Sequence, residues 1–186
     1  DAHMITLSSH TNDTTTTKPL APQLTPTDAN PPRRGQEERR LTITALGQEA
    51  IIGVYAANDG TAGGAIAALK GAGFATLPPV TGQDAELAGV QRILAGEQYM
   101  TAYKGIKREA TIAAEMAIAA ATGVQYRGKP TQTVSNGSVD VPSVLLEPTV
   151  VTRENVADVI IADGFHTAEE VCATEYRQAC QRAGIS

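Results

Sequence analysis

Apolar segments alternate with helical patterns along most of the chain. Short apolar runs that predict buried strands occupy 51–57, 76–82 and 98–103. Helical periodicity follows each run: in 61–72, in the segment before Gly96 where Leu87, Val90 and Leu94 share one face, and in 107–122. Strands that alternate with helices predict an α/β fold, a Rossmann-like parallel sheet flanked by helices.

The pattern is less regular beyond 122. Asn136 and Gly137 predict a turn, and 144–151 is strand-like but interrupted by Pro148. Two short helices are predicted near 156–162 and 168–183.

Residues 1–40 differ in character from the rest of the chain. They contain consecutive threonines at 14–17 and five of the ten prolines, and they have no apolar periodicity. Such a composition predicts a disordered Thr/Pro-rich segment, because it buries too little apolar surface to offset chain entropy. Its mixed-charge end is interpreted as a solvated linker, with a basic contact patch as the alternative. The chain is therefore divided into a disordered segment, 1–40, and one α/β lobe, 41–186.

Composition excludes several classes of protein. A net charge of −5, a pI near 5.2 and the absence of tryptophan argue against a nucleic-acid partner, whose phosphates require a clustered basic face. No apolar run approaches the ~20 residues of a membrane-spanning helix. The first residues lack the pattern of a signal peptide, so we expect any export signal to have been removed or never present.

The two cysteines, Cys172 and Cys180, lie eight residues apart near the carboxyl end. In an exported protein this spacing favours a disulfide that holds the last helix, and two partly buried free thiols are the alternative. A zinc site is not predicted, because there is no second close cysteine pair and the three histidines are far apart in sequence. No other cofactor is predicted.

Three successive strand–helix units carry a polar residue where the strand ends: Asn58, Asp84 and Lys104. The carboxyl ends of parallel strands meet at one rim, where open α/β folds bind ligands, so we expect these side chains to converge. An amide, a carboxylate and an ammonium group suit a polyhydroxylated ligand. The alternative is that Asn58 or Asp59, and Asp84, only cap the helices that follow them.

Other chemistry has less support in the sequence. The glycines of 58–64 lack the Gly-Lys-Ser/Thr ending and the spacing of phosphate-binding loops. His166 is the only histidine within the predicted lobe, so a Ser/His/Asp set is not favoured. Asp84 and Glu86 could be paired carboxylates, but Glu86 lies within the following helix and points elsewhere. We therefore predict no enzymatic activity.

Several linked motifs resemble the xylose-binding periplasmic proteins of ABC importers. The resemblance rests on 54–70 (VYAANDGTAGGAIAALK), 81–96 (TGQDAELAGVQRILAG), 100–104 (MTAYK), 136–137 (NG), 141–148 (VPSVLLEP) and 163–166 (DGFH). It implies a periplasmic-binding-protein-like lobe that binds a monosaccharide and works with an ABC permease outside the cytoplasm. It also implies that Asn58, Asp84 and Lys104 contact sugar hydroxyls, and we add Asp59 and Gln83 from the same motifs.

The resemblance covers roughly 50–185, so it implies a chain without the amino-terminal lobe that closes over the sugar in this family. A half-site open to water predicts millimolar affinity or none, unless a second lobe or self-association completes it. The alternatives are a sensor or protein-interaction module, or a fragment that keeps the fold without binding. A cytoplasmic effector-binding regulator shares the fold, but the sequence lacks a basic helix-turn-helix segment.

Overall fold

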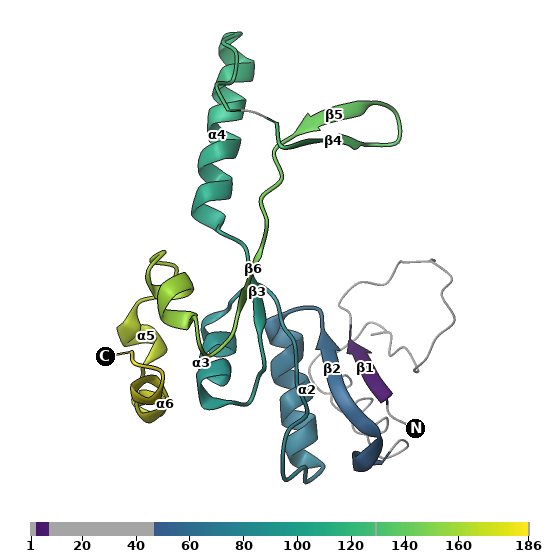
Figure 1. The fold of residues 1–186 in the computed structure, drawn as a ribbon, viewed down its shortest axis with the longest axis vertical. Coiled ribbons are helices and arrows are strands. Elements are labelled where there is room, and N and C mark those ends of the chain that lie inside the picture. Colours follow the sequence, from purple (N-terminus) through teal and green to yellow (C-terminus); the bar gives the residue numbers. More distant parts are fainter. Residues whose placement is uncertain (1–2, 8–46, 129, 186) are drawn as a thin grey trace, which may run out of the picture. The chain divides into compact units, whose positions relative to one another are not determined.

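The computed structural model describes residues 3–7, 47–128 and 130–185 (Figure 1). The chain divides into two compact units, one formed by Asp1–Tyr103 with Val150–Ser186 and the other by Lys104–Thr149. The prediction of one lobe over 41–186 did not anticipate this division. The predicted disorder of 1–40 falls outside the described residues, apart from 3–7.

Unit 1 contains the predicted parallel arrangement of strands. β1 (His3–Leu7) pairs in parallel with β2 (Ile51–Ala56), and isolated parallel bridges join Val54 to Val80 and Gln83 to Ala102. β3 (Thr101–Tyr103) then pairs with β6 (Thr149–Val151). The α/β prediction is confirmed, although the segment predicted as a strand at 76–82 forms bridges instead of a full strand.

β1 is an element that the sequence analysis did not predict. Its residues lie in the segment predicted to be disordered, yet they pair with β2 from His3 beside Ile51 to Leu7 beside Ala56. The pairing covers hydrogen-bonding groups along the edge of β2, which an open strand edge would leave exposed. A composition averaged over forty residues could not reveal a strand of five.

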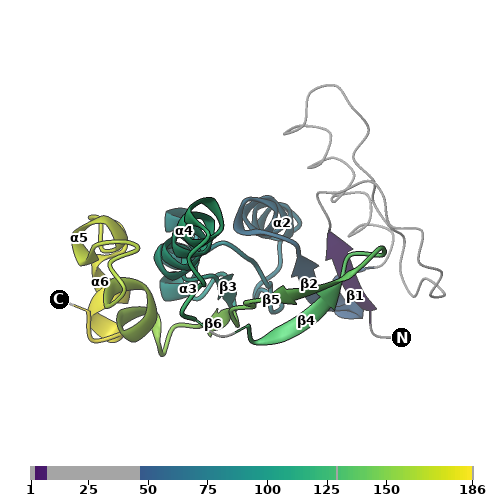
Figure 2. The same cartoon turned by 90° about the horizontal axis from the view of Figure 1, so that it is seen from above.

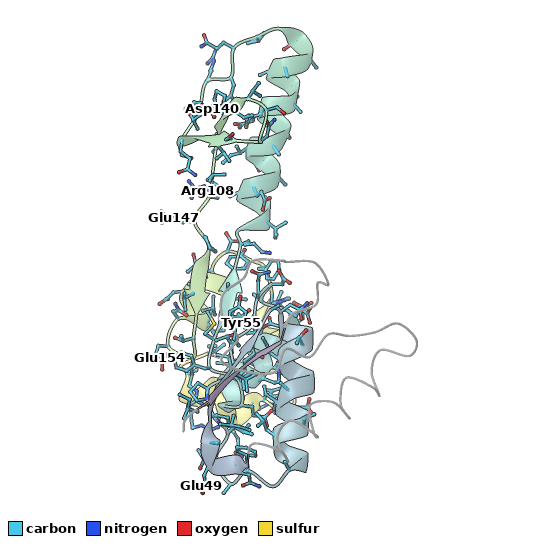
Figure 3. The ribbon with its side chains drawn as sticks, turned by 90° about the vertical axis from the view of Figure 1, so that its right-hand side faces the viewer. Glu49, Tyr55, Arg108, Asp140, Glu147 and Glu154 are labelled. Atoms are coloured by element: carbon cyan, nitrogen blue, oxygen red, sulfur yellow. A yellow bond between two sulfur atoms is a disulfide. The ribbon has the colours of Figure 1, made fainter. Side chains whose placement is uncertain are left out.

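Two helices pack in unit 1 close to the predicted positions. α2 (Asp59–Gly71) lies on one face of β2 (Figure 2) and buries Ala62, Ala65, Ile66 and Leu69 against it. β2 also has two side chains that are about half exposed, Ile52 and Tyr55, of which Tyr55 is labelled in Figure 3. α3 (Leu87–Ala95) ends where predicted, at Gly96, whose φ of 82° belongs to the left-handed cap that glycine favours.

The carboxyl-terminal segment packs against α3 in short helices. η2 (Ala157–Ile161) is a turn of π-helix, and α5 (Ala168–Val171) and α6 (Arg177–Arg182) replace the single helix predicted over 168–183. The predicted Cys172–Cys180 disulfide is present and bridges the break between α5 and α6. Cys180 is buried with Val171 and Ile160 in the same apolar cluster.

Unit 2 consists of a helix and a hairpin. α4 (Ile106–Thr122) ends at Gly123, and β4 (Gln132–Ser135) pairs antiparallel with β5 (Asp140–Ser143) through the predicted turn at Asn136 and Gly137. No described residue of 104–149 is buried. Across the described part of the chain, no helix is long and apolar enough to cross a membrane.

Replacing Cys172 by Ser should lower the free energy of unfolding by about 2–3 kcal/mol, because the short loop closed by the disulfide no longer restricts the unfolded chain. Urea denaturation measures this change. A reductant should lower the stability of the wild type by a similar amount and leave a Cys172→Ser/Cys180→Ser double variant unchanged. Equal stability of the wild type with and without reductant would contradict a stabilising disulfide between Cys172 and Cys180.

Candidate functional site

Asn58 stands just beyond the carboxyl end of β2, half-buried. Its Oδ1 accepts a hydrogen bond of 2.8 Å from the backbone N–H of Thr61, so Asn58 is the N-cap of α2. The side-chain oxygen of Asn58 therefore caps α2, as the alternative prediction for this residue proposed. The cap uses only the oxygen of the amide, and any role in ligand binding rests on the NH₂ group.

Asp84 has a backbone conformation that is rare for residues with a side chain. Its φ is 90°, and that of Ala85 is 50°. Such conformations cost on the order of 1–3 kcal/mol each and persist only where the surroundings hold them. The N-cap of α3 is Glu86, so Asp84 does not occupy the capping position that was its alternative role. Helix capping therefore does not explain the positive φ angles of Asp84 and Ala85.

Backbone hydrogen bonds fix the loop that carries Asp84. The N–H of Asp84 donates to the carbonyl of Ala102 at 3.0 Å, and the N–H of Ala85 donates to Oγ1 of Thr101 at 3.1 Å. The next N–H, that of Glu86, donates to Oδ2 of Asp59 at 2.9 Å. The backbone that carries Asp84 is thus held by three successive hydrogen bonds.

Asp59 is completely buried, whereas Asn58, Gln83 and Asp84, which were predicted with it as ligand contacts, are half-buried or exposed. Besides the bond from Glu86, its carboxylate accepts bonds from Nε2 of Gln98 at 2.7 Å and from Oγ1 of Thr101 at 3.0 Å. Burial raises the pKa of Asp59, and these donated bonds oppose part of that rise. Because the Asp59 side chain has no exposed surface, its carboxylate supports the rim from below.

Glycine and arginine complete the surroundings of this carboxylate. A Cβ at Gly82 or Gly89 would collide with the Asp59 carboxylate, so both positions require glycine. Arg92 donates from Nη2 to the backbone carbonyl of Asp59 at 2.7 Å and from Nε to Oε1 of Gln98 at 3.1 Å. Arg92 therefore orients Gln98 toward Asp59 and joins α3 to the start of α2.

The other two predicted site residues occupy different surroundings. Gln83 is exposed, and its backbone carbonyl accepts a 3.0 Å hydrogen bond from the N–H of Asp59, which places Asn58 and Asp84 on neighbouring segments. Lys104 follows β3 directly, as predicted, and is the first residue of unit 2. There it lines a pocket of about 450 Å³ with Met116, Leu145 and others. The convergence of Lys104 with Asn58 and Asp84 stays a prediction.

Sequence reasoning missed the residues that hold the rim in place. Gln98 and Thr101 are almost fully buried polar residues within a segment that had been assigned simply as a strand. Two polar side chains in an otherwise apolar strand were the available signal, because buried polar groups require partners. His166 was considered only as a catalyst. Among the described residues, no group of acidic, histidine or cysteine side chains could hold a metal ion.

Parallel strands flanked by helices, with polar residues at the carboxyl ends of the strands, define an α/β lobe of the kind in which ligand sites lie at that edge. The model of the periplasmic binding protein domain matches residues 21–125. The chain belongs to the periplasmic binding protein family.

Two relatives in that family are D-xylose-binding periplasmic proteins. The D-xylose-binding periplasmic protein of Escherichia coli (strain K12) is 47% identical over 65% of this chain, and that of Haemophilus influenzae is 40% identical over 72%. The chain spans only 36% and 39% of the lengths of these two proteins.

Solved structures of solute-binding proteins resemble the fold. A carbohydrate transporter solute-binding protein from Chloroflexus aurantiacus, in complex with D-glucose, has a TM-score of 0.65 and 32% identity, and the match covers 75% of this chain and 41% of that one. An ABC transporter solute-binding protein from Clostridium phytofermentans, with bound β-D-glucose, has a TM-score of 0.66 and 28% identity, covering 75% and 44%.

Replacing Asp59 by Asn should lower the free energy of unfolding by about 2–3 kcal/mol, because the new NH₂ group would face buried donors that now have an acceptor. Chemical denaturation measures the loss. Asp158→Asn, at an exposed acid in the same unit, is the control and should change stability by less than about 0.5 kcal/mol. Equal stability of the two variants would contradict a supporting role for Asp59.

Proposed function

We propose that this chain supplies part of the substrate-binding component of an ABC sugar importer. It binds a monosaccharide of the xylose type outside the cytoplasm, without catalysis, and presents it to a membrane permease. The observation that carries this proposal is Asp84, held by backbone contacts in a rare conformation at the carboxyl rim of the sheet, beside Asn58. An outlier that the structure maintains at cost is typical of a ligand site.

The chemistry of the rim fits sugar hydroxyls. An ionised Asp84 carboxylate accepts hydrogen bonds from two hydroxyl groups, and the Asn58 NH₂ group donates one while its oxygen caps α2. Gln83 is exposed next to Asp84 and offers a second amide. Lys104 donates from the end of the next strand. Charged partners make such bonds roughly twice as strong as neutral ones.

A complete site requires more surface than unit 1 provides. The relatives are much longer than this chain, and the described residues of unit 2 include none that is buried, although α4 alone has 17 residues. A single helix and a hairpin have little stability without a core. We propose that further polypeptide, or self-association, completes the second lobe and that the two lobes close on the sugar as a hinge.

The exposed apolar residues of unit 2 favour a second candidate function, a protein-interaction module. The large apolar side chains that are more than one-third exposed there are Ile106, Met116, Ile118, Val124, Val134, Val139, Val141 and Leu145. Apolar surface of this extent marks interaction sites in soluble proteins. Sugar binding by the isolated chain separates the two candidates.

Titration calorimetry with xylose, ribose, arabinose and glucose tests the proposal. We expect saturable binding of one sugar with a Kd of about 1 mM, near −4 kcal/mol, because only part of the site is present. Asp84→Asn should weaken binding by about tenfold to a hundredfold, since hydrogen bonds to a charged group contribute about 1.5–3 kcal/mol. Asparagine tolerates positive φ, so the loop is expected to keep its conformation.

Asn58→Ser is the matched variant for the second contact. Serine caps a helix as well as asparagine does, so stability should change by less than about 0.5 kcal/mol, while the NH₂ group proposed to reach the sugar is replaced by a shorter hydroxyl. Weaker binding at unchanged stability supports direct contact. Unchanged binding in both variants, or no heat with any sugar up to tens of millimolar, argues against this chain as a sugar receptor and favours the interaction module.

A further inference from the structure

The loop 163–166, which connects η2 to α5, contacts two of the strand ends that carry the proposed ligand residues. Gly164, with φ of 70°, forms its turn, and the N–H groups of Gly164 and Phe165 donate to the carbonyls of Ile161 and Ile160. On the other side, Thr167 and Glu170 form a capping box that starts α5. Both ends of the loop are therefore anchored.

The first contact reaches the strained loop at Asp84. Nε2 of His166 lies 2.8 Å from the carbonyl oxygen of Ala85. A carbonyl oxygen only accepts, so Nε2 carries the proton and donates it. The N–H of Ala85 donates to Thr101, so both backbone polar groups of Ala85 have partners. The residue that follows Asp84 is thus held from opposite sides, one of which is His166.

The second contact reaches the end of β3. The hydroxyl of Tyr103 donates to Oδ2 of Asp163, and the ring of Phe165 lies 5.0 Å from that of Tyr103 and 4.7 Å from that of His166, measured between centroids. Burial, together with the Asp163 carboxylate, raises the pKa of Tyr103 to about 12. The hydroxyl therefore stays protonated and remains a donor at neutral pH.

We propose that the loop 163–166 is a clamp for the ligand-binding rim, in which His166 and Asp163 are positioning residues. His166 holds the backbone beside Asp84, and Asp163 holds Tyr103, the residue before Lys104. The Phe165 ring packs in a tilted arrangement against both Tyr103 and His166 and so links the two contacts. The inference rests on the proposed function for its link to sugar, but the clamp itself is a property of unit 1 that can be measured without ligand.

Neither residue is assigned to ligand contact. His166 is half-buried and its Nε2 is engaged by a backbone carbonyl, which leaves it unsuited to act as the catalytic base considered from the sequence. Asp163 is engaged by a tyrosine hydroxyl. The order of polar and aromatic side chains in this loop is explained if each holds a different part of the rim.

The test compares His166→Leu, which removes the donor, with His166→Gln, whose side-chain NH₂ group can replace it. The first readout is the nuclear Overhauser effect between the amide and α protons within Asp84 and within Ala85, which is strong at positive φ. The second is sugar affinity. We expect the Leu variant to lose the strong signals and to bind sugar about tenfold more weakly, and the Gln variant to retain both.

A matched control separates clamping from general destabilisation. Val171→Ala removes buried volume from the apolar cluster that also includes Ala85, without changing either partner of the His166–Ala85 hydrogen bond. It should leave the Asp84 and Ala85 signals strong. If the signals persist in His166→Leu, or weaken equally in Val171→Ala, the clamp is overturned. If the wild type binds no sugar while His166→Leu still loses the signals, the clamp stands and the proposed function fails.

The Asp163 contact is tested by tyrosine titration, which stays informative even if His166→Leu does not fold. Of the five tyrosines, one should ionise only near pH 12 in the wild type, and Tyr103→Phe should abolish that late step. Asp163→Asn keeps the hydrogen bond but removes the charge, so Tyr103 should ionise at lower pH. A late step that is unchanged in Asp163→Asn overturns the pairing of these residues.

Discussion

The buried carboxylate of Asp59 is the interaction on which the rest of unit 1 depends. It receives hydrogen bonds from the N–H of Glu86, from Gln98 and from Thr101. These donors come from the start of α3 and from the segment that leads into β3, while Asp59 itself begins α2. A buried charge is stable only when paired with donors, so the carboxylate imposes a single arrangement on segments that are distant in the sequence.

This constraint also explains the small residues around the site. Gly82 and Gly89 leave room for the carboxylate, and a side chain at either would displace it. The close approach brings the backbone of Gln83 against Asp59, and the chain must then turn sharply through Asp84 and Ala85 to reach the N–H of Glu86. The positive φ angles of Asp84 and Ala85 are therefore part of the same constraint as the buried carboxylate.

Sequence reasoning identified the fold, but it could not show which side chains are buried or what they contact. Alternation of strands and helices predicted the α/β architecture, because the apolar spacing that marks a strand or a helix is a local property of the sequence. Asn58 and Asp59 are neighbours of similar polarity, and only the packing shows that one reaches the surface while the other is fully buried. His166 and Ala85 are separated by 81 positions, so no local pattern could reveal their contact. The division at Tyr103 and Val150 was missed for the same reason, since it depends on which segments pack together.

The energetic consequence is that the loop of Asp84 and Ala85, part of the proposed ligand site, is already ordered without a ligand. The strain at Asp84 and Ala85 is offset by contacts with Thr101, Ala102 and His166, so little ordering of this loop is left for binding to accomplish. Preorganisation of this kind improves affinity by reducing the entropy lost on binding. Preorganisation does not replace missing contact surface. Sugar hydroxyl groups that stay exposed to water gain little free energy from hydrogen bonds to one side of the ligand alone. On the proposed function, the affinity of the isolated chain is therefore limited by missing contact surface, while the backbone that carries Asp84 is already held in place.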